Sequence, residues 1–409
     1  MTNRDKQIVR ELAKRYMELT SSEKQQKMFR RMKDNNDLNP GRPPVLIDEV
    51  PWYQMNIDDE LTCICEDPRV RGVEYGLRVP LFYMKHFSRI DNIYEPFFRV
   101  TRAVHMTGIG VENPQYETKR TDDYNNIISR KLEDVLEDES CLEKFKLPEM
   151  QLAPEIDQEN MDFVTDLIGD SMPVKLRGFG PYYFCSWDRI AMLRGMEAIM
   201  IDLYDRPEYL LAIFQKYIDY ANAQLDFLEK NMEVDPEVTV VHCTPALISG
   251  LGEGLKGTWF RDNAQPLGDI SPSMFEEFAI DPIIELASRF KYTYYGCCEP
   301  LDNKFDAVIM IPNLRKIGCT PWADVNVMAE RVKGDYVLAS KPNPAHVAIK
   351  TDPELIRSEI EKTVKACIKN GCPYEFVIKD ISTVSNDPYN LIVWQDTVGK
   401  VLDEYYGEI

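Results

Sequence analysis

From residue 44 onward, short β-rich runs alternate with longer helical stretches, and this alternation most restricts the folds open to the chain. Repeated βα units predict a parallel sheet covered by helices, because parallel strands need a long crossover that is usually a helix. Two such helices are clear, at 206–230 and at 271–290, where Ser271 is the N-cap and Pro272 the first helical residue. Eight strands are predicted, at 44–49, 98–105, 173–178, 237–243, 293–298, 315–319, 336–341 and 374–380.

Eight strands of this kind predict an α/β fold, a (β/α)8 TIM barrel, preceded by an N-terminal helical extension. Residues 1–36 show apolar side chains at helical spacing, with Thr20 and Glu23 in a capping-box pattern before a second helix. The stretch "NNDLNPGRPP" ends that helix. We therefore divide the chain into a helical extension, 1–40, and a barrel, 41–409.

Composition and charge restrict the class of protein. The 48 Lys and Arg against 68 Asp and Glu give a net charge of −20, which disfavours binding to nucleic acid. No apolar run approaches the ~18–20 residues that span a bilayer, and the charged start "MTNRDKQIVRELAKR" lacks a signal peptide's apolar core. Ten scattered cysteines predict reduced thiols. We expect a cytoplasmic protein without membrane partners.

The active site of a TIM barrel lies at the carboxyl ends of its strands, so the residues at those ends are the candidates for chemistry. Many of them are metal ligands or ionisable groups. They are Glu49, His105, His242, Cys243, Cys297, Cys298, Cys319, Lys341 and Asp380.

Thiolate, imidazole and carboxylate together suit Zn²⁺, whose catalytic sites keep three protein ligands and one open position. Three ligands could come from Cys297, Cys298, His242, Cys243, Cys319 and Glu299. Side chains alternate along an extended strand, however, which argues against two adjacent cysteines binding one ion. The alternative is that a cysteine packs in the barrel wall and His242 in the core.

Other segments predict contacts with a substrate. Lys341 lies in the rigid turn "SKPNP". Its own positive charge would lie over the barrel mouth, or it would form a structural ion pair. The long segment 244–270, with Trp259 and Arg261, predicts a lid. Glu49 and Trp52 would grip a substrate or brace the extension. No GxGxxG, Walker A, GxSxG or HRD motif is present, so nucleotide and serine-hydrolase chemistry lack their usual support.

The segments "MLRGMEAIMIDLYDRPEYL" and "GDISPSMFEEFAIDPII", followed by a strand that ends in cysteine, occur in an order that resembles the uroporphyrinogen decarboxylase superfamily. The resemblance spans residues 40–405 and is strongest to the branch that contains cobalamin-dependent methyltransferases. True decarboxylases of this superfamily carry an arginine-rich motif after the first strand, where this chain has "IDEVPWYQM". The resemblance therefore implies a methyltransferase.

Members of that branch bind zinc through a His-x-Cys at one strand end and a cysteine near the last strand. Cys297 matches the first cysteine by position, whereas Tyr295 stands at the histidine position and "IKDIS" offers no cysteine. The ligand set is thus rearranged, or the metal is lost. Candidates to complete it are Cys298, His242, Asp269 and Glu299.

The resemblance implies a zinc-dependent enzyme that moves a methyl group from a small methylated substrate, such as a methoxylated aromatic, to the corrinoid of a separate partner protein. It also implies a homodimer. The alternatives are a metal-independent decarboxylase or lyase of a small acid on the same fold, and a non-catalytic binding protein. The assigned residues are Glu49 and Lys341 for catalysis, Trp52, Trp259, Arg261 and Tyr295 for the substrate, and Cys297, Cys298 and His242 for the metal.

Overall fold

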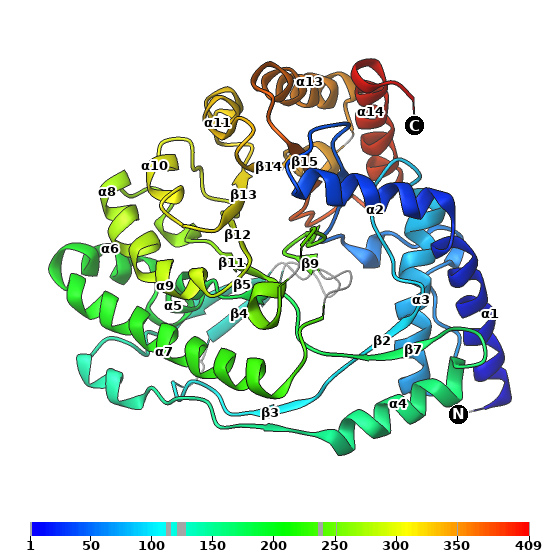
Figure 1. Cartoon of the computed structure of the whole chain (residues 1–409), viewed down its shortest axis with the longest axis horizontal. Coiled ribbons are helices and arrows are strands. Elements are labelled where there is room, and N and C mark those ends of the chain that lie inside the picture. The colour runs from blue at the N-terminus through cyan, green and yellow to red at the C-terminus, as the bar shows by residue number, and fades with distance from the viewer. Residues whose placement is uncertain are drawn as a thin grey trace.

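The computed structural model describes residues 2–111, 116–120, 128–235, 240–250, 252–349 and 351–408. Figure 1 shows a mixed α/β molecule in which a curled sheet is flanked by helices, with the N-terminal helices on its right-hand side. In the described part of the chain, no helix combines the length and apolarity that crossing a bilayer takes.

A seven-stranded sheet forms the centre of the fold, and all its neighbouring strands run parallel. Within the described ranges the edge strands of this sheet do not pair with each other, so the sheet is an open curl. Its order is β1 (Val45–Ile47), β15 (Tyr374–Ile378), β14 (Val337–Ser340), β13 (Leu314–Cys319), β12 (Tyr292–Tyr295), β11 (Trp259–Asp262) and β8 (Tyr182–Tyr183).

Five predicted strands lie in this sheet, as β1, β12, β13, β14 and β15. The predicted strands at 98–105 and 173–178 form β2 (Phe98–Thr101) and β7 (Val174–Arg177), which pair with each other in a separate parallel ladder. β7 leads through residues 178–181 directly into β8. The run from 98 to 105 is also broken, because β3 (Val104–Met106) pairs antiparallel with β6 (Met150–Leu152).

The prediction of a sheet strand at 237–243 is wrong where the structure describes it; residues 237–239 lie outside the described residues. Residues 240–245 form a hairpin, in which β9 (Val240–Val241) pairs antiparallel with β10 (Thr244–Pro245). The strand that does enter the sheet is β11, which the sequence reading had placed in a lid. β11 is fully buried, so this part of the predicted lid is wrong. A second hairpin joins β4 (Tyr116–Arg120) to β5 (Ile128–Leu132).

The two faces of the sheet bury different partners, because alternate residues of a strand point to opposite sides. On one face, apolar residues such as Phe260, Ile317 and Phe376 join the main core with the helices. On the inner face, Trp259 and Tyr294 pack against the β9–β10 hairpin and the loop after it. This hairpin therefore fills the hollow of the curled sheet, and Figure 1 shows β9 near the centre of the molecule.

A buried ion pair fastens the hairpin to the inner face. Lys316 Nζ, on β13, lies 2.9 and 2.8 Å from the two carboxylate oxygens of Glu375 on β15. The same amine donates to the hydroxyl of Thr244 at 3.1 Å, and that hydroxyl donates to Glu375 at 3.1 Å. Lys316 and Glu375 are both fully buried, so each depends on the other for its charge to be tolerated.

Helices cover the sheet and close the fold. In α13 (Pro353–Asn370), both ends are capped. Asp352 accepts hydrogen bonds from two backbone N–H groups, Pro353 is the first helical residue, and Gly371 follows the last turn with a φ of 63°. The other helices are α3 (Pro68–His86), α4 (Pro154–Ile168), α5 (Ser186–Arg194), α6 (Met196–Asp205), α7 (Pro207–Asn231), α10 (Phe305–Val308), α11 (Val325–Val332), α12 (Ala345–Ala348) and α14 (Tyr389–Tyr406). The prediction of a helix at 206–230 is confirmed by α7.

The predicted helix at 271–290 starts as expected but is not continuous. Ser271 caps α8 (Pro272–Phe275), which is followed by a π-helical turn, a 3-10 turn and α9 (Ile284–Ser288). Pro282 has no N–H for the carbonyl of Phe278, one turn earlier, and that carbonyl accepts a hydrogen bond from the indole of Trp187 at 3.0 Å. The proline thus explains the break, and a side chain of α5 satisfies the freed group.

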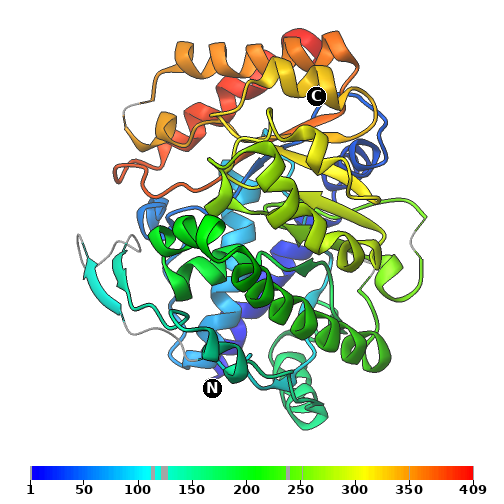
Figure 2. The ribbon, with the colours of Figure 1, turned by 90° about the vertical axis from the view of Figure 1, so that its left-hand side faces the viewer.

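The two predicted N-terminal helices are confirmed as α1 (Asn3–Thr20) and α2 (Glu23–Asn36). The cap of α2 is Ser22, whose hydroxyl accepts from the N–H of Gln25, so the predicted capping role of Thr20 is wrong. α2 reaches the β9–β10 hairpin, because the amide of Asn36 donates to the carbonyls of Pro245 and Leu247 at 3.1 and 2.8 Å. Figure 2 shows the N-terminal helices on the far side of the molecule from α7.

Candidate metal centre

The candidate site lies where the carboxyl ends of β1, β12 and β15 meet the turn of the hairpin. Glu49 follows β1, Cys297 and Cys298 follow β12, and Asp380 follows β15. His242 and Cys243 occupy the hairpin turn between β9 and β10. Four segments distant in sequence thus contribute to one site.

Both neighbouring cysteines face this site because the chain is no longer extended where they lie. Gly296, the residue after β12, has a φ of 95°, a conformation that favours glycine. The two sulfur atoms lie 3.7 Å apart. The alternation of an extended strand, which argued against a joint role for Cys297 and Cys298, therefore does not apply here.

Cys297 is the most buried donor of the pair, with 3% of its surface exposed. Its sulfur lies 3.5 Å from Nε2 of His242. The hydrogen bond from Cys298 lowers the pKa of the Cys297 thiol most, and burial, which alone would raise it, is outweighed by this bond together with His242 and the cations Lys341 and Arg261. The same bond and burial raise the pKa of Cys298. Cys297 is therefore the thiolate of the pair.

These spacings match those of a tetrahedral zinc site. With Zn–S of about 2.3 Å and Zn–N of about 2.0 Å, a sulfur and a nitrogen ligand lie ~3.5 Å apart and two sulfur ligands ~3.8 Å apart. The distances from Cys297 to His242 and to Cys298 are 3.5 and 3.7 Å. Two of the three distances within the predicted ligand set thus suit one ion, but among the described residues the ligand atoms of Cys297, Cys298 and His242 do not all lie within 4.8 Å of one another.

A second group of possible metal ligands also includes His242. Within the described residues, one ligand atom each from Glu49, His242 and Cys243 lies within 4.8 Å of the others. Cys297 and Cys298 are not in this set. His242 is therefore the residue that the two groups of donors share, and Cys243 is a ligand candidate that the leading assignment left out.

His242 is held in the form that binds a metal. It sits at the hairpin turn with a φ of 53°. Burial lowers the pKa of its imidazole to about 4, although the hydrogen bond to Cys297 opposes that effect. A neutral imidazole at ordinary pH keeps a free lone pair for an ion. Its Nδ1 lies 3.5 Å from the hydroxyl of Tyr183.

Lys379 is a site residue that the sequence reading missed. Its amine contacts the carboxylates of Glu49, at 3.3 Å, and of Asp380, and lies 3.9 Å from the sulfur of Cys298. Burial alone would lower the pKa of Lys379, but Cys297 and Asp380 raise it overall. Its position could have been inferred, because residues 375, 377 and 379 share one face of a strand.

Glu49 and Asp380 form an unequal pair of carboxyl groups. Burial and a hydrogen bond with Asp380 raise the pKa of Glu49. For Asp380, burial acts in the same direction but is outweighed by hydrogen bonds with Lys379 and Glu49, so its pKa is lowered. Glu49 is therefore the group of the pair that holds a proton more readily. Both residues have positive φ values, 50° and 56°, a strained geometry that is concentrated at functional sites.

Lys341 and Arg261 lie beneath the cysteines, and both are buried. Lys341 Nζ donates to the carbonyl of Gly296 at 3.2 Å and to that of Cys297. Arg261 donates to the carbonyl of Gly296 at 3.1 Å and stacks on Tyr294 at 4.7 Å. Their charges therefore support the segment that carries Cys297 and act on its thiol from below.

The other predicted substrate residues lie away from this cluster. Tyr295 is fully buried and packs edge-on against Phe275. Trp259 is buried beneath the hairpin loop and donates to the carbonyl of Ala246 at 2.9 Å. Trp52, in a 3-10 turn (Trp52–Gln54), packs on Phe82 and Tyr83 of α3.

Three other predicted candidates also fall outside the cluster. His105 is exposed on β3, 3.7 Å from Glu155. Cys319 is buried on the side of the sheet that faces the helices. Glu299 is buried, and its carboxylate accepts from the backbone N–H groups of Cys297 and Ala264 at 2.9 and 3.0 Å. Glu299 thus orients the loop of the site and offers no free ligand.

Comparisons with known proteins give no information about the residues of this site. No protein-family model matches the chain, and no curated protein matches it. Among solved structures, a methyltransferase from Methanosarcina mazei is similar over 93% of this chain and 99% of that one, with a TM-score of 0.48 and 11% identity. A similarity this distant does not bear on the activity, so the functional case rests on the site.

Proposed function

We propose that the chain is a zinc-dependent methyltransferase that moves a methyl group from a small methylated substrate to the corrinoid of a separate protein. The observation that carries the proposal is the convergence of metal-ligand candidates on His242: the sulfur of Cys297 lies 3.5 Å from its Nε2, and Glu49 and Cys243 each offer a ligand atom within 4.8 Å of it. The resemblance of the sequence to corrinoid-dependent methyltransferases supports the choice of reaction. In this proposal, the curled sheet and the β2–β7 ladder together make a (β/α)8 barrel, residues 41–409, behind the helical extension 1–40.

Cys297, Cys298 and His242 would hold the zinc, and Glu49 and Cys243 lie close enough to His242 to complete or replace a ligand. The bound ion would supply Lewis-acid polarisation of the ether oxygen, thiol or amine that carries the methyl group. The thiolate of Cys297 needs little proton loss before it binds, since its pKa is already lowered.

The chain's own residues supply the proton chemistry. Glu49, with its raised pKa, would give a proton to the heteroatom of the substrate as the methyl group leaves it. Lys379 and Asp380 orient Glu49: the amine contacts its carboxylate, and the N–H of Asp380 donates to the same oxygen at 3.0 Å. Lys341 acts through Cys297, by holding the backbone that carries the thiolate.

The test begins with protein purified without oxygen. We expect one zinc per chain, and we expect the mixture with a reduced corrinoid protein and a methoxylated aromatic or methylamine to change the corrinoid absorbance. The matched control is Glu49→Gln, which removes the proton while keeping the shape of the side chain. This variant should lose the methyl transfer, and its zinc content shows whether the Glu49 carboxylate is also a ligand.

Two outcomes would replace the proposal. Protein free of transition metal, together with carbon dioxide release from a small carboxylic acid, would favour the metal-independent decarboxylase. Absence of any turnover, with tight binding of a small acid, would favour a non-catalytic binding protein. Sedimentation of the purified chain tests the homodimer that the resemblance implies.

A further inference from the structure

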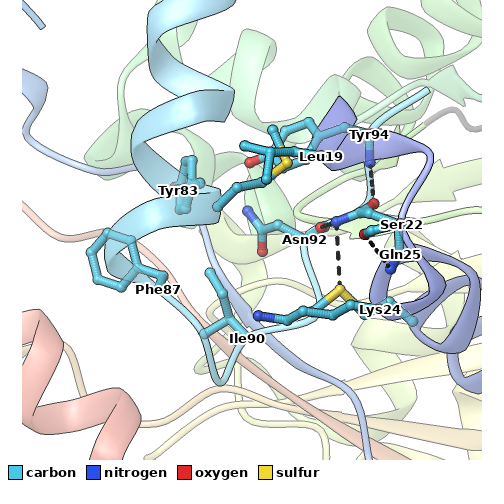
Figure 3. Close-up of a pocket in the computed structure, with 11 residues that line it drawn as sticks. Leu19, Ser22, Lys24, Gln25, Tyr83, Phe87, Ile90, Asn92 and Tyr94 are labelled. Atoms are coloured by element: carbon cyan, nitrogen blue, oxygen red, sulfur yellow. Dashed lines mark hydrogen bonds between the residues drawn. The ribbon is translucent and has the colours of Figure 1, made fainter. Parts of the chain in front are cut away.

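A cavity of about 50 Å³ lies between α2, α3 and the segment after α3, away from the candidate metal centre (Figure 3). Its walls combine apolar and aromatic side chains with polar groups, which come from the start of α2 and from Asn92 and Tyr94. The lining residues used below are Leu19, Lys24, Met28, Met84, Phe87 and Asn92.

Two buried polar atoms at this cavity have no hydrogen-bond partner in the part of the chain that the structure describes. They are Oδ1 of Asn92 and the hydroxyl oxygen of Tyr94. The neighbouring Gln25 is fully used, because its side chain donates to the carbonyl of Asn92 at 3.2 Å and accepts from the N–H of Tyr94 at 3.1 Å. Unpartnered polar atoms are costly when buried, so this cavity is suited to a ligand with a hydrogen-bond donor.

A wider cleft of about 530 Å³ shares Lys24, Met28 and Ile90 with the cavity. Most cations of the cleft are paired. Lys27 lies 3.3 Å from Glu23, Arg31 contacts Asp91, and Arg89 contacts Asp403. The wall that the cavity and the cleft share therefore carries one cation that is not used in this way.

That cation is Lys24, for which no hydrogen bond or ion pair is found among the described residues. The side chain of Lys24 is exposed, and its partial desolvation lowers the pKa of its amine, although the nearby charge of Asp91 opposes the effect. Figure 3 shows the amine of Lys24 and the amide of Asn92 both directed toward the side where Phe87 and Tyr83 lie. A negative group at this point would gain a charge-assisted hydrogen bond.

We propose that this cavity and its mouth bind a small organic acid. Its carboxylate would pair with Lys24, its apolar body would fill the space beside Leu19, Met28 and Phe87, and a hydroxyl group would donate to Asn92 Oδ1. The proposal does not depend on the metal site. The ligand would contact Asn92, whose amide, like the hydroxyl of Tyr83, donates to the carbonyl of Ile47, two residues before Glu49.

The experiment uses the full chain with labelled methionine methyl groups, because Met28 and Met84 line the cavity. The probes are 4-hydroxybutyrate and 4-hydroxybenzoate, with neutral 4-hydroxybenzamide as a comparison. We expect the acids to shift the Met28 and Met84 signals in a saturable way and the amide to bind more weakly. No shift of these signals by either acid at millimolar concentration would overturn the proposal.

A matched pair of variants tests the role of the charge. Lys24→Met should weaken binding of the acids by about tenfold, the effect of one charge-assisted hydrogen bond. Lys27→Met, three residues further along α2 and already paired with Glu23, should leave the affinity unchanged. Equal affinities for both variants would show that Lys24 does not hold the carboxylate and would also overturn the proposal.

Discussion

Replacing Cys297 by serine separates a metal ligand from a cysteine that only packs. The oxygen of serine is smaller and is not a thiolate, so the change removes the sulfur that lies 3.5 Å from His242 Nε2 and 3.7 Å from Cys298 Sγ. The backbone of residue 297 should stay in place, because Glu299 accepts its N–H and Lys341 holds its carbonyl. We therefore expect a local defect in an intact fold.

The expected magnitudes differ between the two roles. Loss of a partner that merely orients a metal ligand costs about 10–100-fold in affinity, so loss of the ligand itself should cost at least ~100-fold, or about 2.8 kcal/mol. The metal-free protein should lose less than about 2 kcal/mol of unfolding free energy, since the substitution changes one buried atom. Zinc affinity should fall far more than stability.

The assay is a zinc titration against a competing chelator, paired with urea unfolding of the metal-free protein. Cys319→Ser is the matched control, because Cys319 is equally buried but lies on the face that packs against the helices. It should retain zinc. If Cys297→Ser keeps its zinc affinity and loses stability as Cys319→Ser does, the assignment of Cys297 as a ligand is refuted. If Cys298→Ser alone loses zinc, the ligand is the neighbour.

Three further predictions concern the supports of the site. The pKa of His242 is lowered to about 4 in the folded protein, so between pH 6.5 and 4 the unfolded metal-free chain binds a proton that the folded chain does not. The free energy of unfolding should therefore fall by about 2–3 kcal/mol as the pH falls through that window. In urea unfolding, His242→Gln should lack this part of the loss. Lys316→Met should lower the free energy of unfolding by about 3–5 kcal/mol, because it leaves the charge of Glu375 buried without a partner. Adding Glu375→Leu should restore most of this loss in thermal unfolding. If the effects of the two substitutions simply add, the pairing is contradicted. Asn36→Ala should weaken zinc binding by about tenfold by loosening the hairpin, whereas Asn35→Ala serves as the neighbouring control and should not.

The arrangement of the site also explains its unusual mixture of groups. The hydrogen bond from Cys298, together with His242 and the cations Lys341 and Arg261, lowers the pKa of the Cys297 thiol. Burial, by contrast, lowers the pKa of the His242 imidazole and raises that of the Glu49 carboxyl. Each group is held in the protonation state that its role requires. The same low-dielectric surroundings strengthen every one of these interactions.

Local pattern in the sequence was enough to determine the alternation of strands and helices. Apolar β-rich runs and capped helices depend on neighbouring residues, so β1, β12, β13, β14 and β15, together with the helices α1, α2 and α7, follow from the sequence alone. The prediction that chemistry gathers at strand ends likewise brought Glu49 and the two adjacent cysteines to attention, because parallel strands end at one edge. The sequence predicts His242 at the end of a sheet strand, but it lies in the turn of an antiparallel hairpin.

Only the tertiary structure decided which of these groups meet. β11 lies in a Gly-rich stretch whose composition is that of a loop, and it becomes a strand because its neighbours β8 and β12 pair with it. The hairpin that carries His242 reaches Cys297 by filling the hollow of the sheet, a position fixed by Asn36 and by Lys316, which are far away in the sequence. Glu49 meets Lys379 across 330 residues. Contacts of this kind are formed by the packing of distant segments, and no local pattern of residues contains them.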